Sequence, residues 1–339
     1  MQSPLPYAAV VFCCMACSEL SRDSAAFEAA LDIDEPSNTT PRSNSLNCRA
    51  RSEPYPSPLP TPSATATRVL SGYLFLEGPV WLPAQGSLYM TDTDFETSTN
   101  PDGPDSKIWR FTPPSTVELL APEAAANGLA LANDGRVLAA TQDTQSLAFF
   151  DPNTGERDDL RLRYRGQRFN SPNDLAVRSD GSIYFTDPDY AIGPRISETR
   201  LYGVYRVSPR GRVSLVDGRV NRPNGIALSP DERTLYVGGR EPAVYKYQLD
   251  DRGDVVGERT VLTEEAGESD GFTIDCAGNL YVTSTTVKVF DPTGALLGEI
   301  VAGEFATNVA FGGPNQTTLY ITSYGELYAI DLNVPGRAY

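Results

Sequence analysis

Six short segments of this chain each begin with a side chain that carries an oxygen atom, directly before a predicted strand. The segments share one pattern: a polar residue, alternating apolar residues, a Gly/Asp/Pro turn and a second strand, as in NDLAVRSDGSIYFTD and NGIALSPDERTLYVGG. Carboxylates and amides of this kind, once gathered, form a ligand set for a hard divalent cation, Ca²⁺ foremost, with Mg²⁺, Mn²⁺ or Zn²⁺ as alternatives. The six opening residues are Glu77, Asn127, Asn173, Asn224, Asp270 and Thr307.

The sequence contains no histidine. This absence excludes Ser-His-Asp and Cys-His catalysis, histidine zinc sites and histidine proton shuttles. Any active site must therefore use carboxylates, amides, hydroxyls, Lys, Arg, Tyr or a metal ion held by oxygen.

The spacing of the segments predicts the elements that bring these side chains together. Their starts lie 37 to 51 residues apart, which is the period of β-propeller blades. Further strand patterns follow each hairpin, and Gly and Pro punctuate the chain without long helical patterns. We predict an all-β, six-bladed β-propeller over residues 69–333. Because the innermost strand of each blade lines the central tunnel, the six opening side chains should face one point on the axis.

A second interpretation of the same residues is structural. Asn or Asp before Gly is also a turn signal, so the openings could simply be turns. Glu77 has no such role before Gly78 and Pro79, and a charged side chain at a strand start in a narrow tunnel needs a partner. The sequence therefore favours a metal ring.

The first 68 residues differ in composition from the repeats. Residues 1–17 resemble an export or lipoprotein signal, with a short apolar core that ends at Cys17, the candidate site of a lipid anchor. The alternative is a disordered start of a cytoplasmic protein. Residues 18–68 are rich in Pro, Ser and Thr and are predicted to be a disordered linker. Four of the five cysteines precede the repeats, so we do not expect a disulfide framework to hold the fold.

The formal net charge of −16 disfavours some partners. An acidic protein repels phosphate backbones and anionic membrane surfaces, so no nucleic-acid partner is expected. We expect a monomer whose partner is a small molecule.

Four phrases in the repeats resemble the gluconolactonase/regucalcin family, also called the senescence-marker-protein family. They are LEGPVW (76–81), RFNSPNDLAVRSDGSIYFTDPDY (168–190), RPNGIALSPD (222–231) and SDGFTIDCAGNLYV (269–282), and they occur in the family's order. The resemblance spans nearly everything after the linker. It implies a six-bladed propeller with one catalytic divalent metal in the central channel.

The resemblance also implies roles for single residues. Glu77, Asn224 and Asp270 match the family's metal ligands, and Asp270 matches the acidic residue that accepts or donates the proton. Asn173 matches a residue that binds the metal directly or reaches it through water and substrate. Arg168 and Asn127 are candidates for substrate binding. The candidates for the rim of the site are Asp187, Tyr190 and Tyr324.

The activity that the resemblance implies is hydrolysis of a sugar lactone. The metal would polarise the carbonyl, and Asp270 would assist the attack of water. Metal-dependent phosphotriesterases of the diisopropyl-fluorophosphatase type share this fold and ligand set, so they form one alternative. A non-enzymatic exported propeller with a structural ion is the other.

Overall fold

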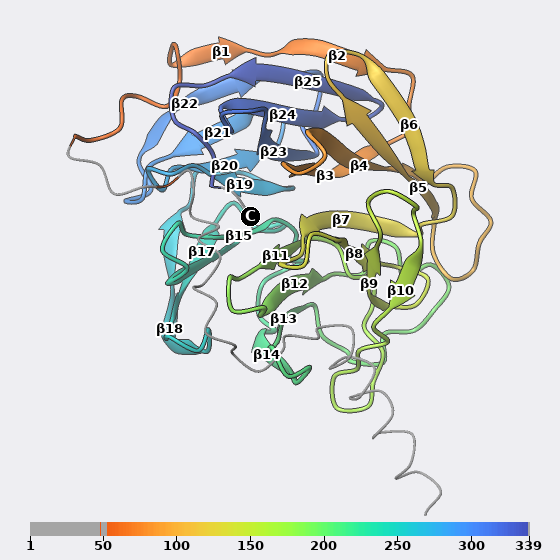
Figure 1. Ribbon diagram of the computed structural model, residues 1–339. Coiled ribbons are helices and arrows are strands. Elements are labelled where there is room, and N and C mark those ends of the chain that lie inside the picture. Colours follow the sequence, from red (N-terminus) through yellow and green to blue (C-terminus); the bar gives the residue numbers. More distant parts are fainter. Residues whose placement is uncertain (1–47, 49–52, 338–339) are drawn as a thin grey trace, which may run out of the picture.

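The computed structural model describes residue 48 and residues 53–337. Every helix or strand element in these residues is a strand, and the strands form six sheets arranged around a common centre (Figure 1). The prediction of an all-β, six-bladed propeller is confirmed. The predicted signal and most of the predicted linker lie outside the described residues. In the part of the chain that the structure describes, no helix is long and apolar enough to cross a membrane.

The blades follow the chain in order, and the first strand of each blade is the innermost. Blade 1 contains β3 (Leu76–Leu82), β4 (Ser87–Asp94), β5 (Asp105–Thr112) and β6 (Thr116–Ala121). Blade 2 contains β7 (Ala126–Leu131), β8 (Val137–Thr141), β9 (Ser146–Phe150) and β10 (Arg157–Asp159). Blade 3 contains β11 (Leu175–Val177), β12 (Ile183–Asp187), β13 (Gly203–Val207) and β14 (Val213–Asp217).

The other three blades complete the ring. Blade 4 contains β15 (Ile226–Leu228), β16 (Thr234–Val237), β17 (Val244–Leu249) and β18 (Val255–Thr263). Blade 5 contains β19 (Phe272–Ile274), β20 (Leu280–Thr283), β21 (Val287–Phe290) and β22 (Leu296–Val301). Blade 6 contains β23 (Asn308–Gly312), β24 (Thr318–Ser323) and β25 (Glu326–Asp331).

The segment before the repeats closes the ring, so the folded part begins earlier than the predicted boundary at residue 69. Strand β2 (Thr67–Ser71) pairs antiparallel with β25 and becomes the outermost strand of the last blade. Strand β1 (Ser63–Thr65) pairs parallel with β22 and adds a fifth strand to blade 5. Edge strands need backbone hydrogen bonds more than apolar side chains, which is why a Thr- and Ser-rich segment could be mistaken for a linker.

The core lies between the blades. In the described residues, six hydrophobic clusters each combine side chains from two neighbouring blades, one cluster at every interface. At the interface of blades 6 and 1, for example, Trp81 stacks on Tyr320 with ring centroids 5.8 Å apart. Because each strand alternates between two faces and a cluster lies at every interface, every blade buries both of its faces.

A disulfide and the C-terminal segment hold the face of the propeller where the innermost strands end. Cys48 and Cys276 form a disulfide, and Cys276 lies in the turn between β19 and β20. The backbone N–H of Cys276 donates to Pro335 O at 2.9 Å, and that of Arg337 donates to Ile274 O at 3.1 Å. The chain is therefore ordered beyond the predicted end at residue 333.

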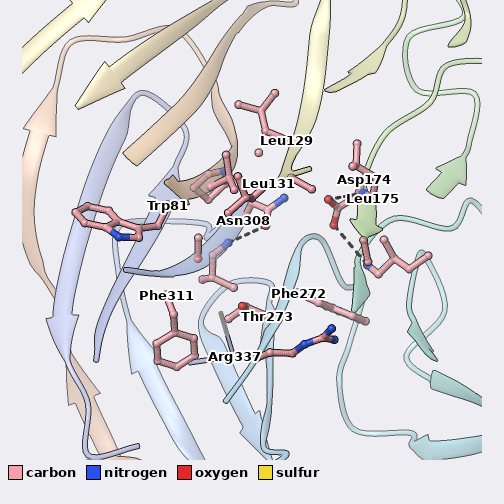
Figure 2. A pocket seen from close by; sticks show the side chains of 18 of the residues that line it. Trp81, Leu129, Leu131, Asp174, Leu175, Phe272, Thr273, Asn308, Phe311 and Arg337 are labelled. Atoms are coloured by element: carbon pink, nitrogen blue, oxygen red, sulfur yellow. Dashed lines mark hydrogen bonds between the residues drawn. The ribbon is translucent and has the colours of Figure 1, made fainter. Parts of the chain in front are cut away.

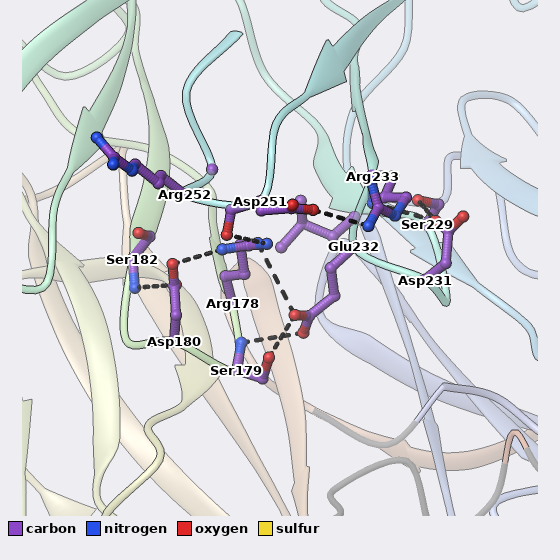
Figure 3. A network of polar contacts seen from close by, with 12 residues as sticks. Arg178, Ser179, Asp180, Ser182, Ser229, Asp231, Glu232, Arg233, Asp251 and Arg252 are labelled. Carbon is purple, nitrogen blue, oxygen red and sulfur yellow. Dashed lines mark hydrogen bonds and ion pairs between the residues drawn. The ribbon is translucent and has the colours of Figure 1, made fainter. Parts of the chain in front are cut away.

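A polar network ties blades 3 and 4 together on this same face (Figure 3). The backbone N–H of Ser179 donates to Glu232 Oε1 at 2.9 Å, and the guanidinium of Arg178 pairs with Asp180. Arg337 also pairs with Glu232 and donates to the carbonyl of Leu228 at 3.1 Å. These contacts lie at the far end of the inner strands, away from the side chains that open the repeats.

Candidate active site

The residues that open the repeats occupy equivalent places in the structure. The backbone N–H groups of Asn173, Asn224 and Asp270 each donate to a carbonyl of the next strand, all at 2.9 Å. In the neighbouring blades, hydroxyls of the second strand donate to the carbonyls of the ring residues, as Thr91 does to Asn127 O at 2.9 Å and Thr186 does to Asn224 O at 2.8 Å. The residues that open the repeats, called the ring residues below, are thus held by contacts to their backbone both within and between blades.

The position after most ring residues is occupied by glycine because a larger residue would clash there. A Cβ atom on Gly225 would lie 2.2 Å from Asp270 O, and one on Gly128 would lie 2.5 Å from Asn173 O. Both distances are shorter than the 3.0 Å below which Cβ atoms essentially never approach another atom. The innermost strands therefore lie too close together at the axis for a side chain at these positions. The Asn-Gly pairs in these blades therefore reflect crowding at the axis rather than a turn alone.

Five of the six ring residues line one open cavity of about 220 Å³. They are Glu77, Asn127, Asn173, Asn224 and Asp270. The sixth, Thr307, instead connects strands: its hydroxyl donates to Leu76 O at 2.7 Å and hydrogen-bonds with Thr322 Oγ1 at 2.8 Å. The structure therefore gathers every predicted metal ligand and Asn127 around one space.

The acidic side chains in this cavity could be neutralised by a cation. Burial raises the pKa of Glu77 to about 7. Burial, followed by the charge of Glu77, raises the pKa of Asp270 well above its usual range. Among the described residues, no Lys or Arg lines the cavity. Two neighbouring carboxylates without a cationic side chain are strongly unfavourable unless protons or a metal ion neutralise them.

The donor set fits a hard divalent cation. All candidate ligand atoms are oxygens, from two carboxylates and several amides, as Ca²⁺ and related ions prefer. The Oδ1 atom of Asn127 is buried with no hydrogen-bond partner in the described structure, which is a costly state for an amide oxygen. No group of three or more His, Cys, Asp or Glu side chains in the described residues could hold a metal, so a site here must include the amides.

Two polar residues stand where other blades have glycine, and the sequence did not single them out. Asn308 donates its Nδ2 to Glu77 Oε2 at 3.1 Å, and Gly78 N donates to the same oxygen at 2.8 Å. Asp174 accepts from Leu175 N at 2.9 Å, and burial, with the charge of Glu77, raises the pKa of Asp174 to about 8. The sequence does mark both positions. Three other repeats open with Asn-Gly or Asp-Gly, whereas these two open with Asn173-Asp174 and Thr307-Asn308, so a polar residue stands in place of the glycine.

Beyond these two residues the tunnel becomes narrow and mostly apolar (Figure 2). Its cavity there measures about 50 Å³ and is lined by Trp81, Leu129, Phe272 and Phe311, with Arg337 at the far end. In the described residues, the wider opening to the ring residues lies on the face on which the repeats open.

Of the four remaining predicted residues, only Tyr190 lines the ring cavity. Arg168 does not lie with the ring: it is half exposed, pairs with Glu198 at 2.7 Å and lines a separate surface depression. The structure therefore does not place Arg168 among the residues that line the ring cavity. Asp187 is fully buried and accepts the backbone N–H groups of Asn170 and Ser171 at 2.8–2.9 Å, so it is not on the rim. Tyr190 lines the cavity, and Tyr324 lies exposed beside it.

The structure adds further lining residues that the sequence did not single out. They are Phe75, Phe95, Glu268, Ser269 and Phe305. All come from loops between strands, where no repeat pattern marks a position.

Comparison with known proteins agrees with this geometry. Residues 75–325 match the family described as the SMP-30/Gluconolactonase/LRE-like region. The chain belongs to this family. A gluconolactonase from Zymomonas mobilis is 34% identical over 280 residues, which cover 76% of this chain and 78% of that protein. A pentonolactonase from Haloferax volcanii is 28% identical over 258 residues, which cover 74% of this chain and 81% of that protein.

Within the SMP-30/Gluconolactonase/LRE-like family, solved structures share the fold. A gluconolactonase from Xanthomonas campestris superposes with a TM-score of 0.69 at 29% identity. The match covers 84% of this chain and 100% of that one. The resemblance seen in the four sequence phrases is therefore confirmed.

Proposed function

We propose that this protein is a divalent-metal-dependent lactonase that hydrolyses the ester bond of a sugar lactone. The observation that carries the proposal is the convergence of Glu77, Asn127, Asn173, Asn224 and Asp270 at one open cavity. Relatives named gluconolactonase and pentonolactonase support the lactone as substrate class. The open cavity speaks against a purely structural ion, which would need no access from solvent.

Four of these residues would hold the ion: Glu77, Asn173, Asn224 and Asp270. Ca²⁺ is the first candidate because all the ligands are oxygens, with Zn²⁺, Mn²⁺ or Mg²⁺ as alternatives. When bound, the cation supplies a Lewis acid that polarises the lactone carbonyl and stabilises the negative charge that develops on its oxygen.

Asp270 is the proposed proton acceptor. Its side chain is partly exposed and lines the cavity, so it can contact a water molecule there. A carboxylate placed there is within reach of a proton released by that water. It takes a proton from the attacking water as the new C–O bond forms. The proton then passes to the leaving oxygen of the opened ring, which gives a hydroxy acid.

Asn127 and Asn173 are the proposed substrate contacts. The buried Oδ1 of Asn127 has no partner in the described structure, so it can accept a hydrogen bond from a substrate hydroxyl. Such a contact orients the lactone over the ring residues.

The test is an assay on protein stripped of metal and reloaded separately with Ca²⁺, Mn²⁺ and Zn²⁺. The proposal expects hydrolysis of glucono-δ-lactone to return with metal, and the Asp270→Asn variant to lose it. Paraoxon and a fluorophosphate are assayed in parallel. Faster hydrolysis of these phosphorus compounds than of any lactone would favour the phosphotriesterase alternative. No hydrolysis of either class of substrate would favour the non-enzymatic alternative, a propeller that only binds metal.

We further propose that the protein is exported. The Cys48–Cys276 disulfide supports this, because disulfides form and persist in oxidising compartments. The proposed signal over residues 1–17 and the lipid anchor at Cys17 lie outside the described residues. Fractionation of cells that express the full chain tests the proposal, and recovery of the protein with reduced cysteines in the cytoplasm would contradict it.

A further inference from the structure

The mouth of the ring cavity has one aromatic side. Phe75 precedes β3, Phe95 follows β4, and Phe305 precedes β23, and all three line the cavity together with the ring residues. Tyr324, in the turn between β24 and β25, contacts two of them. These four residues, which we call the aromatic wall, come from the neighbouring blades 6 and 1.

The rings of the aromatic wall are packed against one another in favourable geometries. Phe75 is central: its ring lies 5.2 Å from that of Phe95 at 90° and 5.7 Å from that of Tyr324 at 70°. The rings of Tyr324 and Phe305 lie 6.0 Å apart. Edge-to-face contacts at such distances are favourable. The wall is therefore an ordered surface that exists before any ligand arrives.

The backbone behind the wall is also fixed. Asp92 Oδ1 accepts the N–H groups of Leu74 and Phe75 at 2.8 and 3.1 Å. Asp94 Oδ1 accepts Thr97 N at 2.7 Å and holds the turn that carries Phe95. Preorganised surfaces of this kind bind apolar groups with little loss of conformational freedom.

Stability alone does not explain the wall. The side chains of Phe95 and Tyr324 are 46% and 45% exposed, so they contribute little to the core. Tyr324 also has a φ of 47°, in the left-handed region that L side chains other than Asn and Asp rarely adopt. An exposed aromatic residue in a turn position suited to Gly or Asn indicates a use other than folding.

The other side of the mouth is polar. Tyr190, Glu268 and Ser269 line it, and Glu268 is paired at 2.6 Å with Arg240, which is not a lining residue. Among the described residues, no lining side chain has a positive charge to pair with a phosphate, sulfate or carboxylate on the substrate. The carboxylate of Glu268 also occupies the nearby guanidinium of Arg240, which is then not free to pair with such a group.

From this asymmetry we propose that the aromatic wall is the subsite for an apolar group or apolar face of a neutral lactone, and that the site discriminates against lactones with an anionic substituent. The wall and the ring share one cavity, so a lactone whose carbonyl lies at Asp270 presents its remote ring carbons to the wall. This inference rests on the proposed lactonase function and narrows its substrate class. Phe95 and Phe305 are then specificity-determining residues.

Binding of lactams tests the subsite without catalysis. 3,4-Dihydro-2-quinolinone and 2-piperidone share a six-membered lactam ring and resist hydrolysis, but only the first carries a fused benzene ring. Isothermal titration on the Ca²⁺-loaded protein is expected to show about tenfold tighter binding of the bicyclic lactam, since the benzene ring buries apolar area against the wall. The Phe95→Ala and Phe305→Ala variants should each lower this ratio severalfold. Leu74→Ala, an exposed residue of the same segment outside the cavity, should leave it unchanged.

Kinetics on the matching lactones separate this inference from the proposed function. Dihydrocoumarin is expected to have a higher kcat/KM than δ-valerolactone, with the ratio lowered in both Phe variants. Equal ratios in wild type and variants, in binding and in kinetics, would overturn the subsite even if every lactone is hydrolysed. Absence of lactone hydrolysis with the lactam preference intact would instead overturn the proposed function and leave the apolar subsite standing.

A second pair of substrates tests the discrimination by charge. 6-Phosphoglucono-δ-lactone should be hydrolysed less efficiently than glucono-δ-lactone, and Glu268→Gln should narrow this difference by up to about fivefold. Glu264→Gln, at an exposed position of the same loop outside the cavity, is the matched control. Equal kcat/KM for the two lactones in the wild type would contradict the inference.

Discussion

The side-chain amide of Asn308 donates to the carboxylate of Glu77 at 3.1 Å, across 231 positions of the sequence. The last blade thus orients the metal-ligand candidate of the first, at the seam where the propeller closes. Closure of the ring and assembly of the site are therefore one event, because Glu77 has this partner only when blades 6 and 1 meet.

The first prediction concerns this contact. Asn308→Ala removes a donor that fixes Glu77, and loss of such a supporting contact typically weakens metal affinity by about 10- to 100-fold. Calcium titration calorimetry measures the effect. Asn279→Ala is the control, because Asn279 makes a similar amide–carboxylate bond with Asp275 at 2.8 Å, at the far end of blade 5. Equal losses of affinity in the two variants would show that the Asn308 contact has no special role.

The second prediction concerns the pH dependence of the metal-free protein. The pKa of Glu77 rises from 4.5 to about 7 on folding, so between these values the folded chain holds a proton that the unfolded chain has released. Stability in EDTA should therefore fall as the pH rises from 5 to 8. Asp174, whose pKa is raised to about 8, adds to the same trend.

Added Ca²⁺ should reverse this trend, since the ion replaces the protons. Thermal melting at several pH values, with EDTA and with Ca²⁺, measures both effects, and Glu77→Gln should flatten the EDTA profile. A melting temperature in EDTA that increases steadily from pH 5 to 8 is the opposite of what we expect.

The third prediction concerns crowding at the axis. Gly225→Ala places a Cβ 2.2 Å from the carbonyl oxygen of Asp270, so it should destabilise the fold by about 1–3 kcal/mol or more and weaken metal binding. Gly218→Ala is the matched control, because its Cβ would meet the nearest atom at an ordinary 3.4 Å. Chemical denaturation measures both, and similar stabilities of the two variants would contradict the steric explanation.

The fourth prediction concerns the disulfide. Cys276→Ser should lower the free energy of unfolding by about 2–4 kcal/mol, because the bond restricts the unfolded chain. Metal affinity should not change, since Cys276 lies at the opposite end of β19 from Asp270. Cys48→Ser should have the same effect and the double variant no larger one. Additive losses would indicate that the two cysteines act independently.

The sequence predicted those parts of the molecule that repeat. The period of the segments and their alternation predicted six blades, and the position of Glu77, Asn173, Asn224 and Asp270 at strand starts predicted that they would meet. Both follow from a symmetry in which equivalent positions of each blade surround one axis.

What breaks the repeat could not be predicted. Phe75, Phe95 and Phe305 lie in loops whose lengths differ between blades, so no pattern places them at the mouth. Edge strand β2 pairs through its backbone, which leaves little trace in side-chain pattern. Arg168 also lies in a segment between strands, where it pairs with Glu198 and not with the ring residues, and no repeat pattern marks its position.

The most direct test of the central claim is a titration of metal-free protein with Ca²⁺ in which bound metal and hydrolysis of glucono-δ-lactone are measured in the same sample. We expect activity to rise in proportion to bound Ca²⁺ and to saturate at one ion per chain, and we expect Glu77→Gln to lose both. Full activity in the metal-free protein, or tight Ca²⁺ binding that survives in Glu77→Gln, would contradict it.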